Sequence, residues 1–125
     1  MNIRVALVDP HAQYRQHLAG LLARESGIAV VSEASGLRSF SDAFLANPPG
    51  VVLFDIDSPA GGGIAALARV AERHPGLRIV ALCLHDEPRL VAAALAAGAC
   101  ACVRKDQPFA HLLAAIHASA RGSAN

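Results

Sequence analysis

The chain has 125 residues, of which 54% are hydrophobic and 17% charged, which is enough for one compact domain with a real core. The net charge is +1, no basic run is present, and there is no Trp and one Tyr, so neither direct nucleic-acid binding nor aromatic stacking is favoured. The apolar start is interrupted at Asp9, too early for a signal peptide, and the uncharged stretch 90–103 is too short to cross a bilayer, so we expect no membrane partner.

Short apolar runs alternate with helical patterns along the whole chain. The runs that predict strands are Ile3–Val8, Ile28–Val31, 51–54, Arg78–Leu84 and Cys100–Val103. The patterns that predict helices start at Ala12, 37, Ile64, Pro88 and Pro108. In the same order, they end at Gly27, Asn47, His74, Gly98 and about Ala120. This alternation predicts an α/β fold in which a parallel sheet has helices on both faces. No linker interrupts it, so we expect one domain over 1–121, followed over 122–125 by a short tail or by the start of a linker to a further domain.

Charged residues follow three of the predicted strands. In VVLFDIDSPAGGG the buried strand 51–54 ends on Asp55, and Asp57 comes two residues later. Asp9 follows the first strand, and Lys105, the single lysine of the chain, follows the fifth. A carboxylate at the end of a buried strand costs solvation and therefore has a partner or a role. Ligands collect at this edge of parallel sheets, so the pattern predicts a pocket for a hard cation such as Mg²⁺ and a phosphoryl group.

These pieces, in this order, resemble the receiver domain of bacterial two-component response regulators. The segments that carry the resemblance are VALVDPH at 5–11, VVLFDIDSP at 51–59, RIVALCLHD at 78–86, GA at 98–99 and VRKD at 103–106. The first and last are most similar to the NarL/FixJ/LuxR-type branch, in which a helix-turn-helix DNA-binding domain follows the receiver. The resemblance implies a flavodoxin-like, doubly wound (βα)5 fold with strand order 2-1-3-4-5. It also implies phosphoryl transfer from a histidine kinase to an aspartate with Mg²⁺.

The resemblance assigns a role to several residues. Asp55 falls on the phospho-accepting position, and Lys105 on the lysine that contacts the phosphoryl oxygens. Asp9 falls on the first of two acidic positions that hold Mg²⁺, and Asp57 where the family uses a backbone carbonyl as a metal ligand. With Asp55 itself, these residues make up the implied metal site. Pro59 matches the proline of the loop after the third strand.

Three positions depart from the family pattern. Pro10 replaces the second acid, Cys83 the Ser or Thr that bonds the phosphoryl group, and Cys102 the aromatic switch residue. Loss of one acid predicts Mg²⁺ binding that is weak or absent, lowered by ~10–100-fold by analogy with other metal-site losses. The Asp57 side chain can compensate by turning inward, and His11 can offer a nitrogen, although Mg²⁺ prefers oxygen. Phosphoryl transfer and its relay across the domain should both weaken.

Simpler interpretations exist for the same residues. Asp9, Asp55 and Lys105 can form a purely structural ion pair, and Asp57 can be a solvated loop acid. Gly61, Gly63 and Ala66 fit G-x-G-x-x-A, which suggests a dinucleotide site, with Asp86 roughly twenty residues on. However, six residues separate the strand from Gly61, whereas a pyrophosphate turn needs glycine almost directly after the strand.

The three cysteines, Cys83, Cys100 and Cys102, are odd in number and closely spaced, so they do not form a disulfide framework. Cys83 and Cys102 would lie on neighbouring strands and near each other, which leaves a redox role open. We favour buried cysteines that act as small hydrophobes in a reduced, cytoplasmic compartment.

Two functions from different classes fit these observations, and neither is enzymatic. In the first, an atypical receiver accepts phosphate on Asp55 inefficiently and sets the dimer state of an attached output domain, through which alone DNA is bound. In the second, a degenerate receiver is a protein-interaction or dimerisation module that works without phosphate. We favour the first, with weak or dispensable phosphorylation, a histidine kinase as donor and a homodimer as the assembly.

Overall fold

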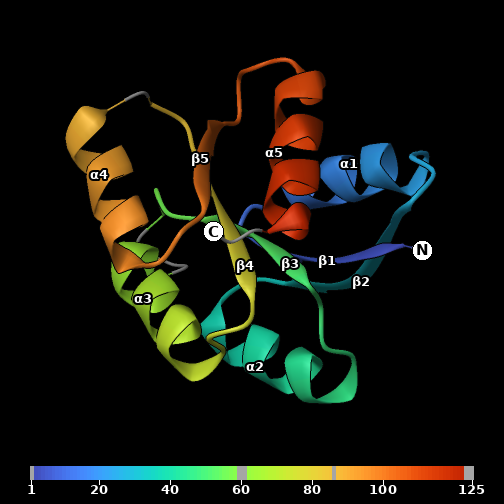
Figure 1. The fold of residues 1–125 in the computed structure, drawn as a ribbon, viewed down its shortest axis with the longest axis horizontal. Coiled ribbons are helices and arrows are strands. Elements are labelled where there is room, and N and C mark those ends of the chain that lie inside the picture. The colour runs from blue at the N-terminus through green and yellow to red at the C-terminus, as the bar shows by residue number, and fades with distance from the viewer. Residues whose placement is uncertain (1, 59–61, 86, 123–125) are drawn as a thin grey trace.

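Five strands and five helices alternate in the computed structural model, which describes residues 2–58, 62–85 and 87–122 (Figure 1). The strands are β1 Ile3–Val8, β2 Ile28–Ala34, β3 Val51–Asp55, β4 Arg78–Cys83 and β5 Ala101–Arg104. The helices are α1 Ala12–Ala23, α2 Leu37–Ala46, α3 Gly63–Arg73, α4 Pro88–Ala97 and α5 Phe109–Arg121. Pro59, Gly61 and Asp86 lie outside the described residues. No described helix is long and apolar enough to cross a membrane.

The strands form one parallel sheet in the order β2-β1-β3-β4-β5, with β3 at its centre. Helices α1 and α5 cover one face, and α2, α3 and α4 cover the other (Figure 1). The predicted α/β fold, its flavodoxin-like order and its doubly wound layers are therefore confirmed. In such a sheet all the strands end at the same edge, so the residues that follow them are brought together.

The hydrophobic core has two halves because successive residues of a strand point to opposite faces. In β1, Val5 and Leu7 pack with α1 and α5, whereas Ala6 and Val8 pack with α2, α3 and α4. Strand β3 is buried along its whole length, as its continuous apolar run predicted. Phe54 of β3 and Phe40 of α2 are fully buried on the second face.

Two strand boundaries differ from the prediction. Strand β2 continues to Ala34 instead of ending at Val31, with an irregular register opposite Val5 and Ala6. It lies at the sheet edge, where only one neighbour constrains it and polar residues such as Glu33 remain solvated. Strand β4 ends at Cys83 rather than Leu84, because the Leu84 backbone N–H donates to the Asp57 carboxylate instead of continuing the sheet.

Gly98 ends α4, as predicted, in a backbone conformation with a φ of 125° that side chains disfavour. A Cβ atom at this position would lie 2.6 Å from the Cβ of Ala71 in α3. Both the backbone turn and the close approach of α3 to α4 therefore require glycine here.

We predict that Gly98→Ala lowers the free energy of unfolding by roughly 2–4 kcal/mol, from backbone strain and the contact with Ala71. Gly20→Ala is the matched control, because Gly20 lies inside α1 without a positive φ, and nothing lies within 4 Å of an added Cβ. It should raise the same free energy by roughly 0.5–1 kcal/mol. Urea denaturation followed by circular dichroism measures both, and equal effects of the two changes would contradict the prediction.

Candidate functional site

The carboxyl-terminal edge of the sheet brings three charged residues together. Asp55 is the last residue of β3, Asp9 directly follows β1, and Lys105 directly follows β5. Backbone hydrogen bonds from Asp9 N–H to Ala34 O (2.9 Å) and from Lys105 N–H to Cys83 O (2.8 Å) tie both residues to the neighbouring strands. The backbone therefore holds these side chains at the sheet edge.

The Lys105 ammonium lies between two carboxylates. Its Nζ is 2.7 Å from Oδ2 of Asp9 and 3.0 Å from Oδ1 of Asp55. The side chains are almost completely buried, with exposed fractions of 5% for Lys105, 3% for Asp9 and 0% for Asp55. The predicted convergence of these three residues is confirmed. Their burial distinguishes the cluster from surface ion pairs, which contribute little to stability.

The two acids keep Lys105 charged. Burial by itself lowers the pKa of the lysine, but hydrogen bonds to Asp9 and Asp55 and their negative charges outweigh it. The pKa of Lys105 is consequently raised above its ordinary value, and the side chain is an ammonium at neutral pH.

The cluster has a net charge of −1, and its carboxylate oxygens are only partly satisfied. Among the described residues, Oδ2 of Asp9 and Oδ1 of Asp55 have no polar partner besides the Lys105 ammonium. Oδ2 of Asp55 accepts one hydrogen bond, from the Ser58 backbone N–H at 3.2 Å. An excess of negative charge in a buried, oxygen-rich site favours a cation, so these carboxylates fit a bound divalent ion.

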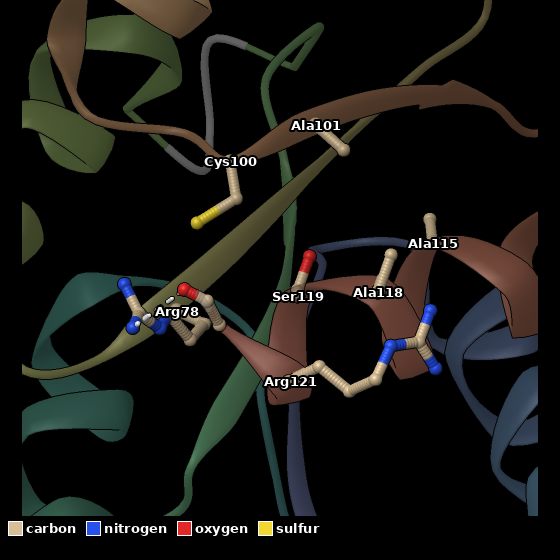
Figure 2. Close-up of a pocket in the computed structure, with 8 residues that line it drawn as sticks. Arg78, Cys100, Ala101, Ala115, Ala118, Ser119 and Arg121 are labelled. Carbon is tan, nitrogen blue, oxygen red and sulfur yellow. Dashed lines mark hydrogen bonds between the residues drawn. The ribbon is translucent and has the colours of Figure 1, made fainter. Parts of the chain in front are cut away.

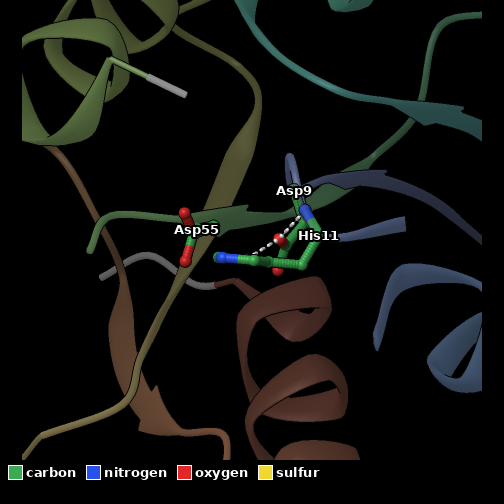
Figure 3. Close-up of side chains that lie close together, drawn as sticks. All are labelled: Asp9, His11 and Asp55. Carbon is green, nitrogen blue, oxygen red and sulfur yellow. Dashed lines mark hydrogen bonds and ion pairs between the residues drawn. The ribbon is translucent and has the colours of Figure 1, made fainter. Parts of the chain in front are cut away.

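His11 is the residue at this site whose place the sequence indicated least. Its Nδ1 lies 2.9 Å from Oδ1 of Asp9, and its backbone N–H donates to the same oxygen at 2.8 Å. Figure 3 shows its ring between the two carboxylates, with a ring nitrogen pointing toward Asp55. Candidate ligand atoms of Asp9, His11 and Asp55 all lie within 4.8 Å of one another. Its position two residues after Asp9 was the only available signal.

The side chain of Asp57 does not turn toward this cluster. Its carboxylate accepts a hydrogen bond from the Leu84 backbone N–H, and the described metal-ligand group contains Asp9, His11 and Asp55 only. The inward turn of Asp57, one of two alternatives that the sequence left open, is therefore not what the structure shows, and its carboxylate instead links the end of β3 to the end of β4. A role for its backbone carbonyl remains a prediction.

Tyr14 of α1 is a residue of this site that sequence reasoning missed, because an aromatic residue within a helix predicts only core packing. Its ring centroid lies 4.6 Å from Nζ of Lys105. Burial raises the pKa of the Tyr14 phenol, Lys105 lowers it, and Asp9 and Asp55 raise it further, with a net increase. Tyr14 is also the only tyrosine of the chain, so its spectrum reports on this site.

Cys83 and Cys102 lie close together, as their neighbouring strands suggested. Their sulfur atoms are 3.6 Å apart, in the half of the core that α2, α3 and α4 cover. Cys83 is 1% exposed and Cys102 is partly buried, whereas Cys100 is exposed just before β5. Two small thiols therefore stand where the resemblance implies a hydroxyl and an aromatic ring.

The fold and the site together define a doubly wound α/β domain with a buried acid–lysine cluster at the carboxyl edge of its sheet. The family model for the response regulator receiver domain matches residues 5–117. The chain belongs to this family of two-component signalling domains.

The similar proteins belong to the NarL/LuxR branch of response regulators. The transcriptional regulatory protein UhpA of Escherichia coli K12 is 36% identical over 124 residues, which cover 96% of this chain and 60% of UhpA. A LuxR-family response regulator from Aurantimonas sp. SI85-9A1 superposes with a TM-score of 0.88 at 30% identity, covering 96% of this chain and 86% of that one. The receiver domain of the putative NarL regulator of Mycobacterium tuberculosis gives 0.87 at 28% identity, covering 98% of both. The chain spans about half the length of several relatives.

We predict that Tyr14 ionises with a midpoint above pH 10 and that Asp55→Asn lowers this midpoint, because one negative charge that opposes the phenolate is removed. The neutral phenol is favoured in the folded state, so its contribution to stability is complete below pH ~10 and is lost as the pH rises through the folded pKa. Ultraviolet absorbance of the phenolate, with circular dichroism on the same samples, measures both effects.

Arg121→Gln is the control for this titration, since Arg121 is exposed at the end of α5 and should leave the midpoint unchanged. An unshifted or higher midpoint in Asp55→Asn, with the fold intact, would show that Asp55 does not act on Tyr14.

Proposed function

We propose that this domain is an atypical receiver that accepts a phosphoryl group on Asp55, slowly and with weak binding of Mg²⁺. The observation that carries the proposal is the position of the Lys105 ammonium, within 3.0 Å of Oδ1 of Asp55 and 2.7 Å of Oδ2 of Asp9. A carboxylate with a fixed cation beside it is what phosphoryl transfer needs, because this chemistry depends on positioning and charge neutralisation.

In the proposed reaction a carboxylate oxygen of Asp55 forms the new oxygen–phosphorus bond while the nitrogen–phosphorus bond of a kinase phosphohistidine breaks. Lys105 is already held at the acceptor and would contact a phosphoryl oxygen as a compact point charge. Asp9 and Asp55, with the Asp57 backbone carbonyl, would hold Mg²⁺, which neutralises charge on the transferring group. The Ser58 N–H bond to Oδ2 fixes the orientation of the Asp55 carboxylate.

The atypical character is proposed from Pro10, Cys83 and Cys102. Pro10 supplies no side-chain oxygen, and the Asp57 carboxylate is engaged by Leu84, so the cation site has two carboxylates. A thiol is a weak hydrogen-bond donor, so Cys83 transmits the arrival of a phosphoryl group poorly. Its sulfur already lies 3.6 Å from that of Cys102, which has no ring to reorient. The relay from Asp55 to α4 and β5 should therefore be weak.

The second candidate, a dimerisation module that works without phosphate, is supported by two exposed leucines. Leu84, directly after β4, is 47% exposed and Leu95 of α4 is 46% exposed. Leu95 lies on α4, which the relay would address, and Leu84 lies in the segment between β4 and α4, so a homodimer through this surface is proposed for either mechanism. In the second candidate Lys105 alone neutralises the acids, and Asp55 is structural.

We propose that residues 1–121 form the receiver and that 122–125 begin a linker to a DNA-binding output domain. Arg78 of β4 donates to the Gly122 carbonyl at 3.3 Å, which ties the end of α5 to the sheet. A hollow of about 350 Å³ lies beside this contact, at the opposite edge of the sheet from the charged cluster (Figure 2). Its lining contains Cys100, Ser119 and Arg121 but no carboxylate, so the acceptor site is the cluster and not this hollow.

We predict that acetyl phosphate with Mg²⁺ adds the mass of one phosphoryl group to the wild-type domain and none to Asp55→Asn. The expected adduct is slow and incomplete, because one metal acid is absent. Intact mass spectrometry measures it, and beryllium fluoride with Mg²⁺ should shift the Tyr14 fluorescence as a second readout. If both readouts are silent in a folded wild-type protein, the phospho-acceptor proposal is wrong and the interaction module remains.

We further predict that Pro10→Asp strengthens Mg²⁺ binding by ~10–100-fold, since it restores the missing oxygen ligand. Gln13→Asp is the control, because it adds the same charge at an exposed position of α1 without supplying the absent acid. Isothermal titration calorimetry measures the Mg²⁺ affinity of each variant, and the comparison separates direct ligation of the ion from electrostatic attraction by an added negative charge. Equal gains in Mg²⁺ affinity in the two variants would show that Pro10 does not weaken Mg²⁺ binding by removing a ligand.

A further inference from the structure

The charged cluster contains one group that the proposed reaction does not use, the imidazole of His11. It directly precedes α1, but its side chain makes no capping hydrogen bond to that helix. Its Nδ1 lies 2.9 Å from Asp9, and its ring is directed at Asp55 (Figure 3). The side chain is 53% exposed, so the ring is accessible and has room to adjust.

Asp9 and His11 place an oxygen and a nitrogen side by side. Nδ1 of His11 lies 2.9 Å from Oδ1 of Asp9, which is close to the separation of two adjacent ligand atoms bound to one ion at ~2.0–2.2 Å. An ion held between them would take the place of the proton that Nδ1 donates to Asp9, and the lone pair of Nδ1 would become the ligand. His11 therefore presents a nitrogen donor next to an oxygen of Asp9.

The distances require only a small closure around an ion. The candidate ligand atoms of Asp9, His11 and Asp55 lie within 4.8 Å of one another. Atoms bound tetrahedrally to one ion at ~2.0–2.2 Å lie ~3.3–3.6 Å apart, so the longest of these separations must shorten by roughly 1 Å, which the half-exposed His11 ring has room for. A hollow of about 410 Å³, lined by His11, Gln13, Tyr14, Leu84, Lys105 and Asp106, opens beside the cluster and gives ions a path from solvent.

The donor set favours a different class of ion from Mg²⁺. Mg²⁺ prefers oxygen ligands, whereas an imidazole suits zinc and the other borderline first-row dications. Pro10 removes one oxygen, and His11 supplies one nitrogen next to it in the chain. We propose that Asp9, His11 and Asp55 form a site selective for a borderline dication of the Zn²⁺ class. This inference rests on the proposed function and names the ion that its site takes.

The test is a comparison of Zn²⁺ and Mg²⁺ affinities in the wild-type domain, without an affinity tag, and in His11→Gln. We expect His11→Gln to weaken Zn²⁺ binding by ~10–100-fold and to change Mg²⁺ binding by less than ~3-fold. The test compares the effect of His11→Gln on the two affinities. Tighter binding of Zn²⁺ than of Mg²⁺ would not by itself be evidence, because most mixed nitrogen–oxygen sites bind Zn²⁺ more tightly. Isothermal titration calorimetry gives the affinities, and the quench of Tyr14 fluorescence shows that the ion is at this site.

His111→Gln is the matched control, since His111 is exposed on α5 and lies outside the cluster. A loss of Zn²⁺ affinity no greater than in this control would overturn the inference. The nitrogen chemical shifts of the His11 imidazole give an independent measurement that does not depend on a variant. They should move at one equivalent of Zn²⁺ and stay unchanged with Mg²⁺, and unmoved shifts with Zn²⁺ would also overturn it.

The two proposals fail separately. If His11→Gln leaves the Zn²⁺ affinity unchanged while Mg²⁺ still supports an Asp55-dependent beryllium fluoride complex, the ion inference is wrong and the phospho-acceptor function stands. If His11-dependent Zn²⁺ binding is found but neither ion supports an adduct on Asp55, the metal site stands and the phospho-acceptor function is wrong.

Discussion

The Lys105 ammonium bridges two carboxylates at an almost completely buried position, and the arrangement of the site depends on this contact. Removal of the lysine would leave Asp9 and Asp55 buried side by side, and breaking a buried ion pair in this way costs ~3–5 kcal/mol. The same contact keeps the lysine charged. The domain therefore has a neutralising group in place before any cation or phosphoryl group arrives.

This contact exists because the sheet is parallel. Strands β1, β3 and β5 all end at one edge, and the residues that follow them come from distant parts of the chain. Helices on both faces bury the strands, and the edge keeps an opening to solvent beside His11 and Lys105. A buried charge cluster with an opening at a strand edge is the arrangement that open α/β sheets use for ligands.

The departures from the family pattern change the site without changing the fold. Pro10 and the engaged Asp57 carboxylate leave two acids for a cation, and a ring nitrogen of His11 lies next to one of them, Asp9. Cys83 and Cys102 fill the core where a hydroxyl and a ring would report the state of Asp55. These substitutions are the basis of the proposal that the domain is an atypical receiver, and the ion pair at Lys105 is present alongside them.

The sequence by itself determined the order of the elements along the chain, the parallel sheet and the meeting of Asp9, Asp55 and Lys105, because strand ends follow from local apolar patterns and parallel strands end at one edge, whereas the strand order came from the family resemblance. Only the tertiary structure decided where the side chains of Asp57 and His11 point. Each side chain can contact several partners within a few ångströms. The Asp57 carboxylate accepts a hydrogen bond from Leu84 after a neighbouring strand, and the His11 ring lies between Asp9, two residues before it, and Asp55 of another strand. Local patterns carry no information on such contacts between distant segments.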